Sequence, residues 1–464
     1  MMQMLAIAVI VPGMVWLLVL NWKQQEKVSR AFWIPLSWML IVGSRSVSSW
    51  FNLQSGTTIL DRFTEGTPLD AAIYAVLILC GLFVLNSRAR QIDGFLRSNP
   101  ALLVFFGYCA AAVLWSDFPL IALKHWIKLL GSLAIVLVVL TEANPWGAIR
   151  RLFSTSALIL LPLSVLFILG FPELGSKFND YDHLMYYNGV TTQKNELGMI
   201  SLIFGLAALW MLLEDLDHRG RAGWRGRLAV QCSVLLMALW LIVMANSMTS
   251  LSSFMLSALV MVLVGRPWAS RHAANAHLLA GSAVGLAVFA LFIDSTGALL
   301  RMLGRNPTLT GRTDIWKAVL SYHTNPLIGR GFDSFWLGSR IEGVAHLIGY
   351  KGITQAHNGY IETYINLGWI GVALLGWLIA SGYLRGVKML RVDPSAGRFQ
   401  VAMVASAIMY NLSEAEFRSV TLSWMVFLLA IVEIPALRPN RATRPVKELQ
   451  SLRATPAKTM RILR

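Results

Sequence analysis

Long apolar segments separated by short polar connections recur along the whole chain. Most have roughly 17 to 25 residues, the length at which an α-helix crosses the hydrocarbon core of a bilayer. A membrane β-barrel would instead show alternating segments of about ten residues. The pattern therefore predicts an all-α polytopic membrane protein with about 12 to 13 transmembrane helices. We expect these helices near residues 3–20, 32–50, 71–86, 101–115, 122–140, 152–170, 197–213, 228–245, 249–265, 278–293, 359–383, 399–413 and 418–436.

One polar interval, residues 294–358, is much longer than the other connections. It contains two apolar i,i+4 pairs, Ile315/Val319 and Trp316/Leu320. This helical spacing predicts a short amphipathic helix that lies on the membrane surface and is ended by Asn325-Pro326. The loop is therefore expected to be partly helical. Because loops on rigid scaffolds often carry binding and catalytic residues, we expect this one to cover an active site.

Charged residues are few and unevenly distributed. They make up 14% of the chain, and 56% of the residues are hydrophobic, whereas soluble proteins carry about 25% charged residues. The net charge of +16 does not indicate nucleic-acid binding, because the basic residues are divided among the connections between apolar segments, as the positive-inside rule requires. The basic connections are residues 23–30, 88–97, 150–151, 219–227 and 385–398, together with the tail after Pro435.

This asymmetry predicts how the chain is oriented in a bacterial cytoplasmic (inner) membrane. The basic connections and the tail face the cytoplasm, so the 294–358 loop lies outside, towards the periplasm. Residues 1–436, including this loop, then form a single transmembrane domain. Residues 437–464 form a basic cytoplasmic tail that we expect to be disordered or loosely bound to anionic lipid headgroups. Residues 3–20 lack the features of a cleavable signal peptide and are expected to be the first transmembrane helix.

Polar residues gather at five places on the predicted outer side. The first is the stretch 189–198, where Lys194, Asn195 and Glu196 begin a helix. A helix N-terminus and a lysine together suit a phosphate group. The alternative is that Asn195 only caps the helix and Lys194 is solvated. The second place, residues 245–250, is a tight turn or a broken helix that lines a cavity.

The third place is Arg312, whose guanidinium can bind a phosphate through two parallel hydrogen bonds. It could instead pair with Asp314 or anchor the loop to the membrane. The fourth is His357 with Asn358 and Glu362. A histidine is suited to accept a proton near neutral pH. The alternative is structural, because Asn358 could cap the helix and Glu362 could interact with its dipole.

The fifth place is residues 411–418, which contain two carboxylates and an arginine. Ionisable groups near membrane depth mark a functional site or pair with one another, and Glu414 with Arg418 is the simplest such pair. The sequence contains no cluster at metal-ligand spacing, no Walker loop and no dinucleotide fingerprint. We therefore expect no metal and no cofactor, and the energy for any reaction must enter with the substrate.

Four motifs together resemble the O-antigen ligase/polymerase superfamily. They are Gly-x4-Lys-Asn-x-Leu-Gly at 189–198, Gly-Arg-Thr-Asp-Ile-Trp at 311–316, Pro-Leu-Ile-Gly-x-Gly at 326–331 and Ala-His-Asn-Gly-Tyr-Ile-Glu at 356–362. The continuation at 367–371 fits the same pattern, and the resemblance covers roughly residues 185–385. Within the superfamily the chain is most similar to the exopolysaccharide polymerases of the succinoglycan type, partly through Asn411-Leu412-Ser413-Glu414.

The resemblance implies a metal-independent, inverting glycosyltransferase on the outer face of the cytoplasmic membrane. It would polymerise undecaprenyl-diphosphate-linked oligosaccharide repeat units into exopolysaccharide. His357 would be the base, while Arg312 and Lys194 would bind the diphosphate and stabilise its developing charge. Further expected substrate contacts are Asn195, Asn358, Tyr360, Glu362, Arg330 and Glu414. Many relatives have an arginine near 246–250, where this chain has Met248.

Other functions remain open at this point. A ligase that transfers the glycan to lipid A-core shares the donor, the leaving group and the base. A flippase or transporter would favour ionisable residues at the bilayer midplane and related halves. The expected partners are the lipid-linked donor, the growing glycan acceptor, membrane lipids and a chain-length regulator or export complex. The sequence does not identify the sugar.

Overall fold

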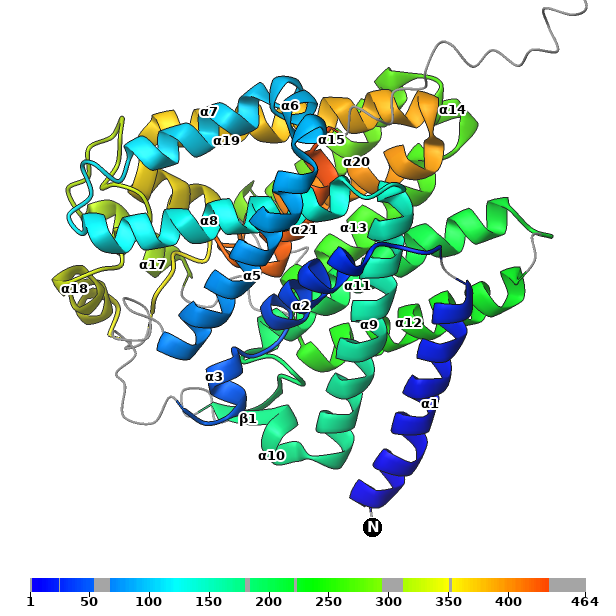
Figure 1. The fold of residues 1–464 in the computed structure, drawn as a ribbon. Helices are drawn as coiled ribbons and strands as arrows, with labels where there is room; N and C mark the ends of the chain where they lie inside the picture. Colours follow the sequence, from blue (N-terminus) through cyan, green and yellow to red (C-terminus); the bar gives the residue numbers. More distant parts are fainter. Residues whose placement is uncertain are drawn as a thin grey trace, which may run out of the picture.

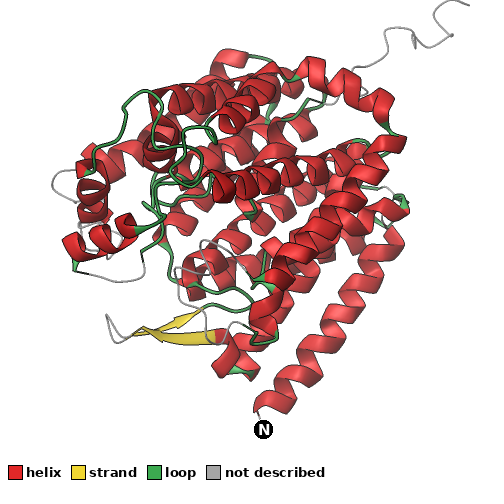
Figure 2. Ribbon diagram, turned by 60° about the vertical axis from the view of Figure 1, so that its left-hand side comes forward, coloured by secondary structure: helices red, strands yellow, loops and turns green. Residues whose placement is uncertain are grey.

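The protein is described here from a computed structural model, which covers residues 2–24, 26–53, 67–179, 184–220, 223–293, 312–349 and 353–433. Most of these residues are helical, and two short strands, β1 (Ser176–Asn179) and β2 (Leu184–Tyr187), form an antiparallel hairpin. Within these ranges, eight helices are long and apolar enough to cross a membrane. The predicted all-α polytopic membrane protein is therefore confirmed (Figures 1 and 2). The predicted tail, 437–464, lies outside the described residues.

Each of the thirteen predicted segments contains a helix. The eight long helices are α1 (Met2–Gln24), α5 (Pro68–Ser87), α8 (Pro119–Leu140), α9 (Pro145–Gly170), α11 (Lys194–Asp217), α12 (Trp224–Ala245), α15 (Ala273–Val288, continued as a π-helix over Phe289–Ile293) and α19 (Gly359–Val392). The five shorter ones are α2 (Trp33–Val42), α7 (Pro100–Ala111), α13 (Met248–Val264), α20 (Pro394–Tyr410) and α21 (Leu422–Ile431). The connections contain a 3₁₀ turn (Arg30–Phe32), α3 (Val47–Trp50), α6 (Ala89–Ser98), α10 (Pro172–Gly175), α14 (Pro267–Ser270), α17 (Arg312–Ser321) and α18 (Ser339–Ile348).

Two predicted segments are shorter than expected. The segment 32–50 is interrupted after Val42, because Gly43 ends α2 and Ser46 accepts a hydrogen bond from the Ser49 backbone to begin α3. The segment 418–436 contains α21 only from Leu422, where the Thr421 side chain caps the helix. In both cases small polar residues form local hydrogen bonds that compete with a continuous helix.

The two ends of the bundle differ in chemistry. At one end, Arg150, Arg227 and Arg398 form ion pairs with the three acidic residues at the C-terminus of α11, namely Glu214, Asp215 and Asp217. These arginines come from three different connections that the sequence assigns to the cytoplasmic side. Figure 1 shows α17 and α18 at the opposite end from α14. The N-termini of α11 and α19 and the C-terminus of α20 meet at that opposite end.

The described residues of the long loop pack on an apolar core of their own. Ile315 and Val319 of α17 are buried with Phe335 and Trp336. The predicted helix is therefore confirmed, although it ends at Ser321, before the expected stop. Ile315, Ala318 and Val319 pack inside the protein, whereas Leu320 is exposed, and the position of this helix at the membrane surface stays a prediction.

The motif at 326–331 attaches the loop to a kink in α19. Gly368 has φ +65°, and a Cβ there would lie 2.2 Å from the Leu327 carbonyl group. The amide of Trp369 donates to the Pro326 carbonyl at 2.8 Å, and the amide of Gly331 donates to the Asn366 carbonyl at 2.9 Å. Glycine is required where two backbones approach this closely. The motif at 326–331 and the stretch 367–371 therefore form one structural unit, which attaches the loop to the kink of α19.

Candidate active site

Glu414 is the common partner of three residues from distant parts of the chain. Its Oε1 atom accepts hydrogen bonds from Asn195 Nδ2 at 2.8 Å and from Arg312 Nη2. Its Oε2 atom accepts a hydrogen bond from His357 Nδ1 at 3.0 Å. Glu414 is only 3% exposed. A buried carboxylate needs such partners, because an unpaired charge would be costly to remove from water. We refer to Asn195, Arg312, His357 and Glu414 as the Glu414 cluster.

Asn195 reaches the cluster from the first turn of α11. Its side chain does not cap this helix, as one interpretation of the sequence held, but donates to Glu414. Its carbonyl accepts a hydrogen bond from Tyr410 Oη at 3.1 Å. The side chain of Glu196 contacts the turn before α11, where it accepts hydrogen bonds from the amide and hydroxyl of Thr192. The polar start of α11 is thus held in place from both sides.

Arg312 is the first described residue of α17 and points towards Glu414. The alternative pairing with Asp314 is wrong, since Asp314 lies 4.0 Å from Lys317 and both are well exposed. Arg312 has 14% of its side chain exposed, whereas Lys317 has 81% exposed. A guanidinium carries five N–H donors in a planar fork, so its contact with Glu414 orients it without using all of them.

His357 occupies a left-handed backbone conformation, with φ +49°. Non-glycine residues rarely adopt this conformation, and they do so mainly where the surroundings require it. A carboxylate only accepts hydrogen bonds, so the Nδ1 atom facing Glu414 carries the proton and Nε2 keeps its lone pair. The side chain is 25% exposed. The imidazole is therefore oriented as a base whose anionic partner can stabilise the protonated form.

Three other predicted substrate contacts connect α19 to its neighbours, two of them to the C-terminal end of α20 and one to the loop. Asn358 caps α19 through its Oδ1 atom, and its Nδ2 donates to the Leu412 carbonyl at 2.9 Å. Tyr360 Oη donates to the Ile408 carbonyl at 3.2 Å. Glu362 is buried and accepts hydrogen bonds from Trp336 Nε1 at 2.7 Å and from the Ala356 amide at 2.9 Å. The structural alternative for Asn358 is thus the one that the contacts support.

The two remaining basic candidates lie in different surroundings. Lys194 precedes Asn195 in the chain, and its Nζ lies 3.6 Å from the centre of the Tyr186 ring in β2. Arg330 instead donates to the His323 carbonyl, and its own amide donates to Ile365 of α19 at 3.1 Å. Lys194 is therefore next to the cluster in the chain, whereas Arg330 belongs to the contact between the loop and the kinked helix.

The role of Glu414 differs from the helical pair with Arg418 that the sequence suggested. The helix α20 ends at Tyr410, so residues 411–421 form a non-helical turn in which i,i+4 spacing does not bring side chains together. In this turn the Asn411 side chain accepts hydrogen bonds from the amides of Glu416 and Phe417. The resulting conformation directs Glu414 towards Arg312.

Two acidic groups near the cluster have shifted pKa values. Burial and the neighbouring carboxylates of Glu414 and Glu196 raise the pKa of Glu416 to about 8. For Asp333, burial is outweighed by the nearby His125, Arg418 and Lys128, so its pKa falls to about 2. His125 Nδ1 lies 2.8 Å from the Asp333 carboxylate. Glu416 is therefore largely protonated at neutral pH, whereas Asp333 is ionised.

The raised pKa of Glu416 predicts a specific pH dependence of stability. Its contribution is fully present below the usual glutamate pKa of 4.5 and is lost as the pH rises towards 8. We expect the melting temperature of Glu416→Gln to gain several degrees relative to the unchanged protein between pH 5 and pH 8.5. Thermal unfolding in detergent at several pH values measures this. Parallel curves for the two proteins would contradict the prediction.

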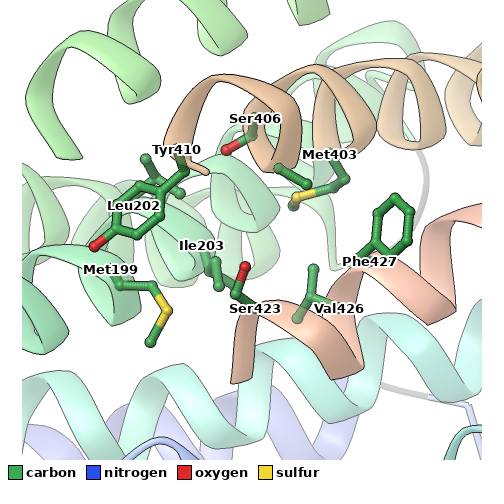
Figure 3. Close-up of a pocket in the computed structure, with 10 residues that line it drawn as sticks. Met199, Leu202, Ile203, Met403, Ser406, Tyr410, Ser423, Val426 and Phe427 are labelled. Carbon is green, nitrogen blue, oxygen red and sulfur yellow. The ribbon is translucent and has the colours of Figure 1, made fainter. Parts of the chain in front are cut away.

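The scaffold next to the cluster is closely packed. The helices α11, α20 and α21 surround a pocket of about 10 Å³ lined mainly by apolar side chains, among them Met199, Ile203 and Val426 (Figure 3). This is barely enough room for one water molecule. Tyr410 lies at this pocket and also binds the carbonyl of Asn195. The cluster thus rests on a rigid base.

Comparisons with known proteins show what this chain is similar to. Residues 233–376 match a family described as O-Antigen ligase, a region that contains Arg312 and His357. The protein is a multi-pass membrane protein, and part of its chain is similar to this family. Over 335 residues it is 24% identical to the exopolysaccharide production protein ExoQ of Rhizobium meliloti, which covers 69% of this chain and 73% of that protein. The resemblance inferred from the motifs is therefore confirmed.

Proposed function

We propose that this protein is a glycosyltransferase that polymerises undecaprenyl-diphosphate-linked oligosaccharide repeat units into exopolysaccharide. The observation that carries the proposal is the Glu414 cluster, in which a base and a phosphate-binding group share one buried carboxylate. The similarity to ExoQ, a protein of exopolysaccharide production, supports the polymer as the product. We propose further that the reaction needs no metal, because Arg312 and Lys194 can supply positive charge to the leaving group.

The proposed reaction is a single displacement at the anomeric carbon. His357 Nε2 accepts the proton of the acceptor hydroxyl while that oxygen forms a bond to the carbon. The bond between this carbon and the diphosphate oxygen breaks, and undecaprenyl diphosphate leaves with the electron pair. Glu414 stabilises the imidazolium that forms. Attack from the face opposite the leaving group inverts the configuration of the sugar.

The proposed location is the outer face of the bacterial cytoplasmic membrane. Reporter fusions at Arg225 and beyond Arg438 are expected to report the cytoplasm, and a fusion at Ser339 the outside. The reason is the asymmetric distribution of basic residues among the connections. Arg227 and Arg398 both form ion pairs with the C-terminus of α11, which supports the placement of their two connections on the same side of the membrane. A cytoplasmic signal from Ser339 would contradict the mechanism.

The contribution of Glu414 can be tested separately from that of the base. Glu414→Gln keeps oxygen and nitrogen atoms for hydrogen bonding but removes the charge that stabilises the imidazolium. We expect the kcat for polymer formation to fall by about 10²-fold or more, with a much smaller change in KM. Glu342→Gln, at an exposed position of α18, is the matched control. Equal kinetics for the two variants would remove Glu414 from the mechanism.

A ligase that transfers the glycan to lipid A-core is the second candidate, supported by the O-Antigen ligase family match. Glycan analysis of a deletion strain separates the two functions. Loss of a polymerase leaves single repeat units on the carrier lipid, and this is the result we expect. Loss of a ligase would leave full-length polymer on the carrier lipid.

A further inference from the structure

A second pocket lies beside the Glu414 cluster. It has a volume of about 350 Å³ and is formed by the turn between α2 and α3, the turn before α11 and the residues that lead into α21. The polar side chains of its lining are those of Ser44, Ser46, Ser49, Thr191, Thr192, Glu196, Glu416 and Thr421. The lining also contains apolar side chains, among them Ile41, Met199 and Leu422, together with the ring of Tyr74. The volume falls in the range of about 300–1,000 Å³ that is usual for small-molecule sites.

The hydroxyls of this pocket are held by hydrogen bonds to the protein. Ser44 Oγ donates to the Leu40 carbonyl at 2.8 Å, and Thr192 Oγ1 donates to Glu196 at 2.5 Å. Thr191 Oγ1 donates to the Asn188 carbonyl at 2.8 Å. A hydroxyl that donates its proton in this way still offers lone pairs. These hydroxyls thus present fixed hydrogen-bond acceptors to a ligand that carries several donors.

Glu416 is partly exposed and adds a carboxyl group with one buried oxygen atom to the pocket. Its Oε2 atom is buried and has no hydrogen-bond partner among the residues that the structure describes. The raised pKa of Glu416 means that this carboxyl carries a proton near neutral pH. A protonated carboxyl can both donate and accept a hydrogen bond. A buried group of this kind costs free energy unless a ligand or water satisfies it.

We infer that this pocket binds a sugar ring of the glycan substrate and that Glu416 binds the hydroxyls of that ring. This inference rests on the proposed function. A sugar presents hydroxyl groups along its edges and C–H groups on its faces, which matches a lining of both polar and apolar side chains. A phosphate does not fit, because the carboxylate of Glu196 lines the pocket and would repel a like charge. An isoprenoid chain would offer no hydrogen bonds to the polar side chains.

Binding measurements on the purified, full-length protein in detergent test this inference. The probes are soluble repeat-unit oligosaccharide released from the producing strain's own polymer and sugar-free undecaprenyl diphosphate. Glu416→Leu removes the polar group, and Ser49→Phe fills the pocket. Glu416→Gln keeps a neutral hydrogen-bonding group of the same shape. Glu173→Leu, at an exposed position of α10, is the matched control for Glu416→Leu.

We expect Glu416→Leu and Ser49→Phe each to weaken oligosaccharide binding by about tenfold or more. Glu416→Gln and Glu173→Leu should stay within about threefold of the unchanged protein. Undecaprenyl diphosphate should bind all variants equally well. Unchanged oligosaccharide binding by Glu416→Leu and Ser49→Phe would overturn the inference. An equal loss of undecaprenyl diphosphate binding would also overturn it, because the pocket would then serve the lipid carrier or the fold.

Turnover of lipid-linked repeat units separates this inference from the proposed function. Suppose that the unchanged protein forms polymer and that Glu416→Leu has normal KM values. This result would contradict only the inference that the pocket binds a sugar ring. Absence of polymer formation by the unchanged protein would contradict the function itself. If the KM of Glu416→Leu rises when the acceptor is varied, the bound ring belongs to the acceptor. If the KM of Glu416→Leu rises only when the donor is varied, the bound ring belongs to the donor.

Discussion

His357→Gln is expected to abolish detectable polymer while the protein remains folded and inserted in the membrane. A sugar hydroxyl is a weak nucleophile, so its attack depends on a base within hydrogen-bond distance. General-base catalysis contributes about 10²–10⁴-fold to a rate. Glutamine can replace the hydrogen bond from His357 to Glu414 but cannot accept a proton from the acceptor. Polymer length and yield at matched membrane expression measure the effect, and His357→Ala should give the same result.

The control for this prediction is His346→Gln, a histidine of α18 in the same loop. It should leave polymer formation within about twofold of the unchanged strain, as surface substitutions usually do. Near-normal polymer from His357→Gln would exclude His357 as the base. Glu414 or Glu362 would then be the better candidate base, and only Glu414 also contacts Arg312.

Arg312→Ala is expected to have the second largest effect. It removes the group that we assign to the diphosphate and leaves Glu414 without its charged partner. A lost charge-assisted interaction of this kind in a buried site costs about 2–4 kcal/mol, which corresponds to a roughly 30- to 1,000-fold lower kcat/KM. Arg312→Lys keeps the charge but loses the planar fork, so we expect a severe but incomplete loss. In vitro turnover of lipid-linked repeat units measures both variants.

Lys317→Ala is the matched control for Arg312→Ala, because it removes a positive charge from an exposed position of the same helix. It should leave turnover nearly unchanged. If Arg312→Lys were as active as the unchanged protein, a point charge would be sufficient and bidentate binding would be excluded. If Arg312→Ala were fully active, the diphosphate would have to bind elsewhere.

The sequence predicts the positions of the helices well because apolar length is a local property. All thirteen predicted segments contain a helix, and the caps at Asn358 and Thr421 explain where two of them begin. The sequence does not predict the interruption after Val42, because five apolar residues come before Gly43 and the hydrogen bonds of Ser46 are not visible as periodicity. Apolar length alone therefore overestimates how continuous a short segment is.

The sequence predicts which residues belong to the site but not which of them contact one another. Arg312, His357 and Asn195 were recognised as candidates, yet their shared partner is 102, 57 and 219 positions away in the chain. Glu414 is a predicted substrate contact, and its alternative pairing with Arg418 depends on i,i+4 spacing in a helix, whereas α20 ends at Tyr410. Contacts across such separations depend on the packing of α11, α19 and α20, which no local pattern encodes.

Several motif residues stabilise the fold, and the sequence alone does not distinguish them from residues that bind substrate. Gly368 allows the kink of α19 to approach the backbone at Leu327, and Glu362 fixes the loop through Trp336. A motif shared for structural reasons looks the same as one shared for catalysis when only the sequence is considered. Contacts separate the two groups, since the catalytic candidates converge on Glu414 while the structural ones join the loop to α19.

Reconstitution of the purified protein in vesicles with lipid-linked repeat units tests the central claim most directly. The measurement counts the undecaprenyl diphosphate released for each glycosidic bond formed and determines the configuration of the new bond. We predict one undecaprenyl diphosphate per bond, inverted configuration, and no release with His357→Gln. Movement of intact lipid-linked repeat units across the bilayer, without release of undecaprenyl diphosphate, would contradict the account and identify a transporter.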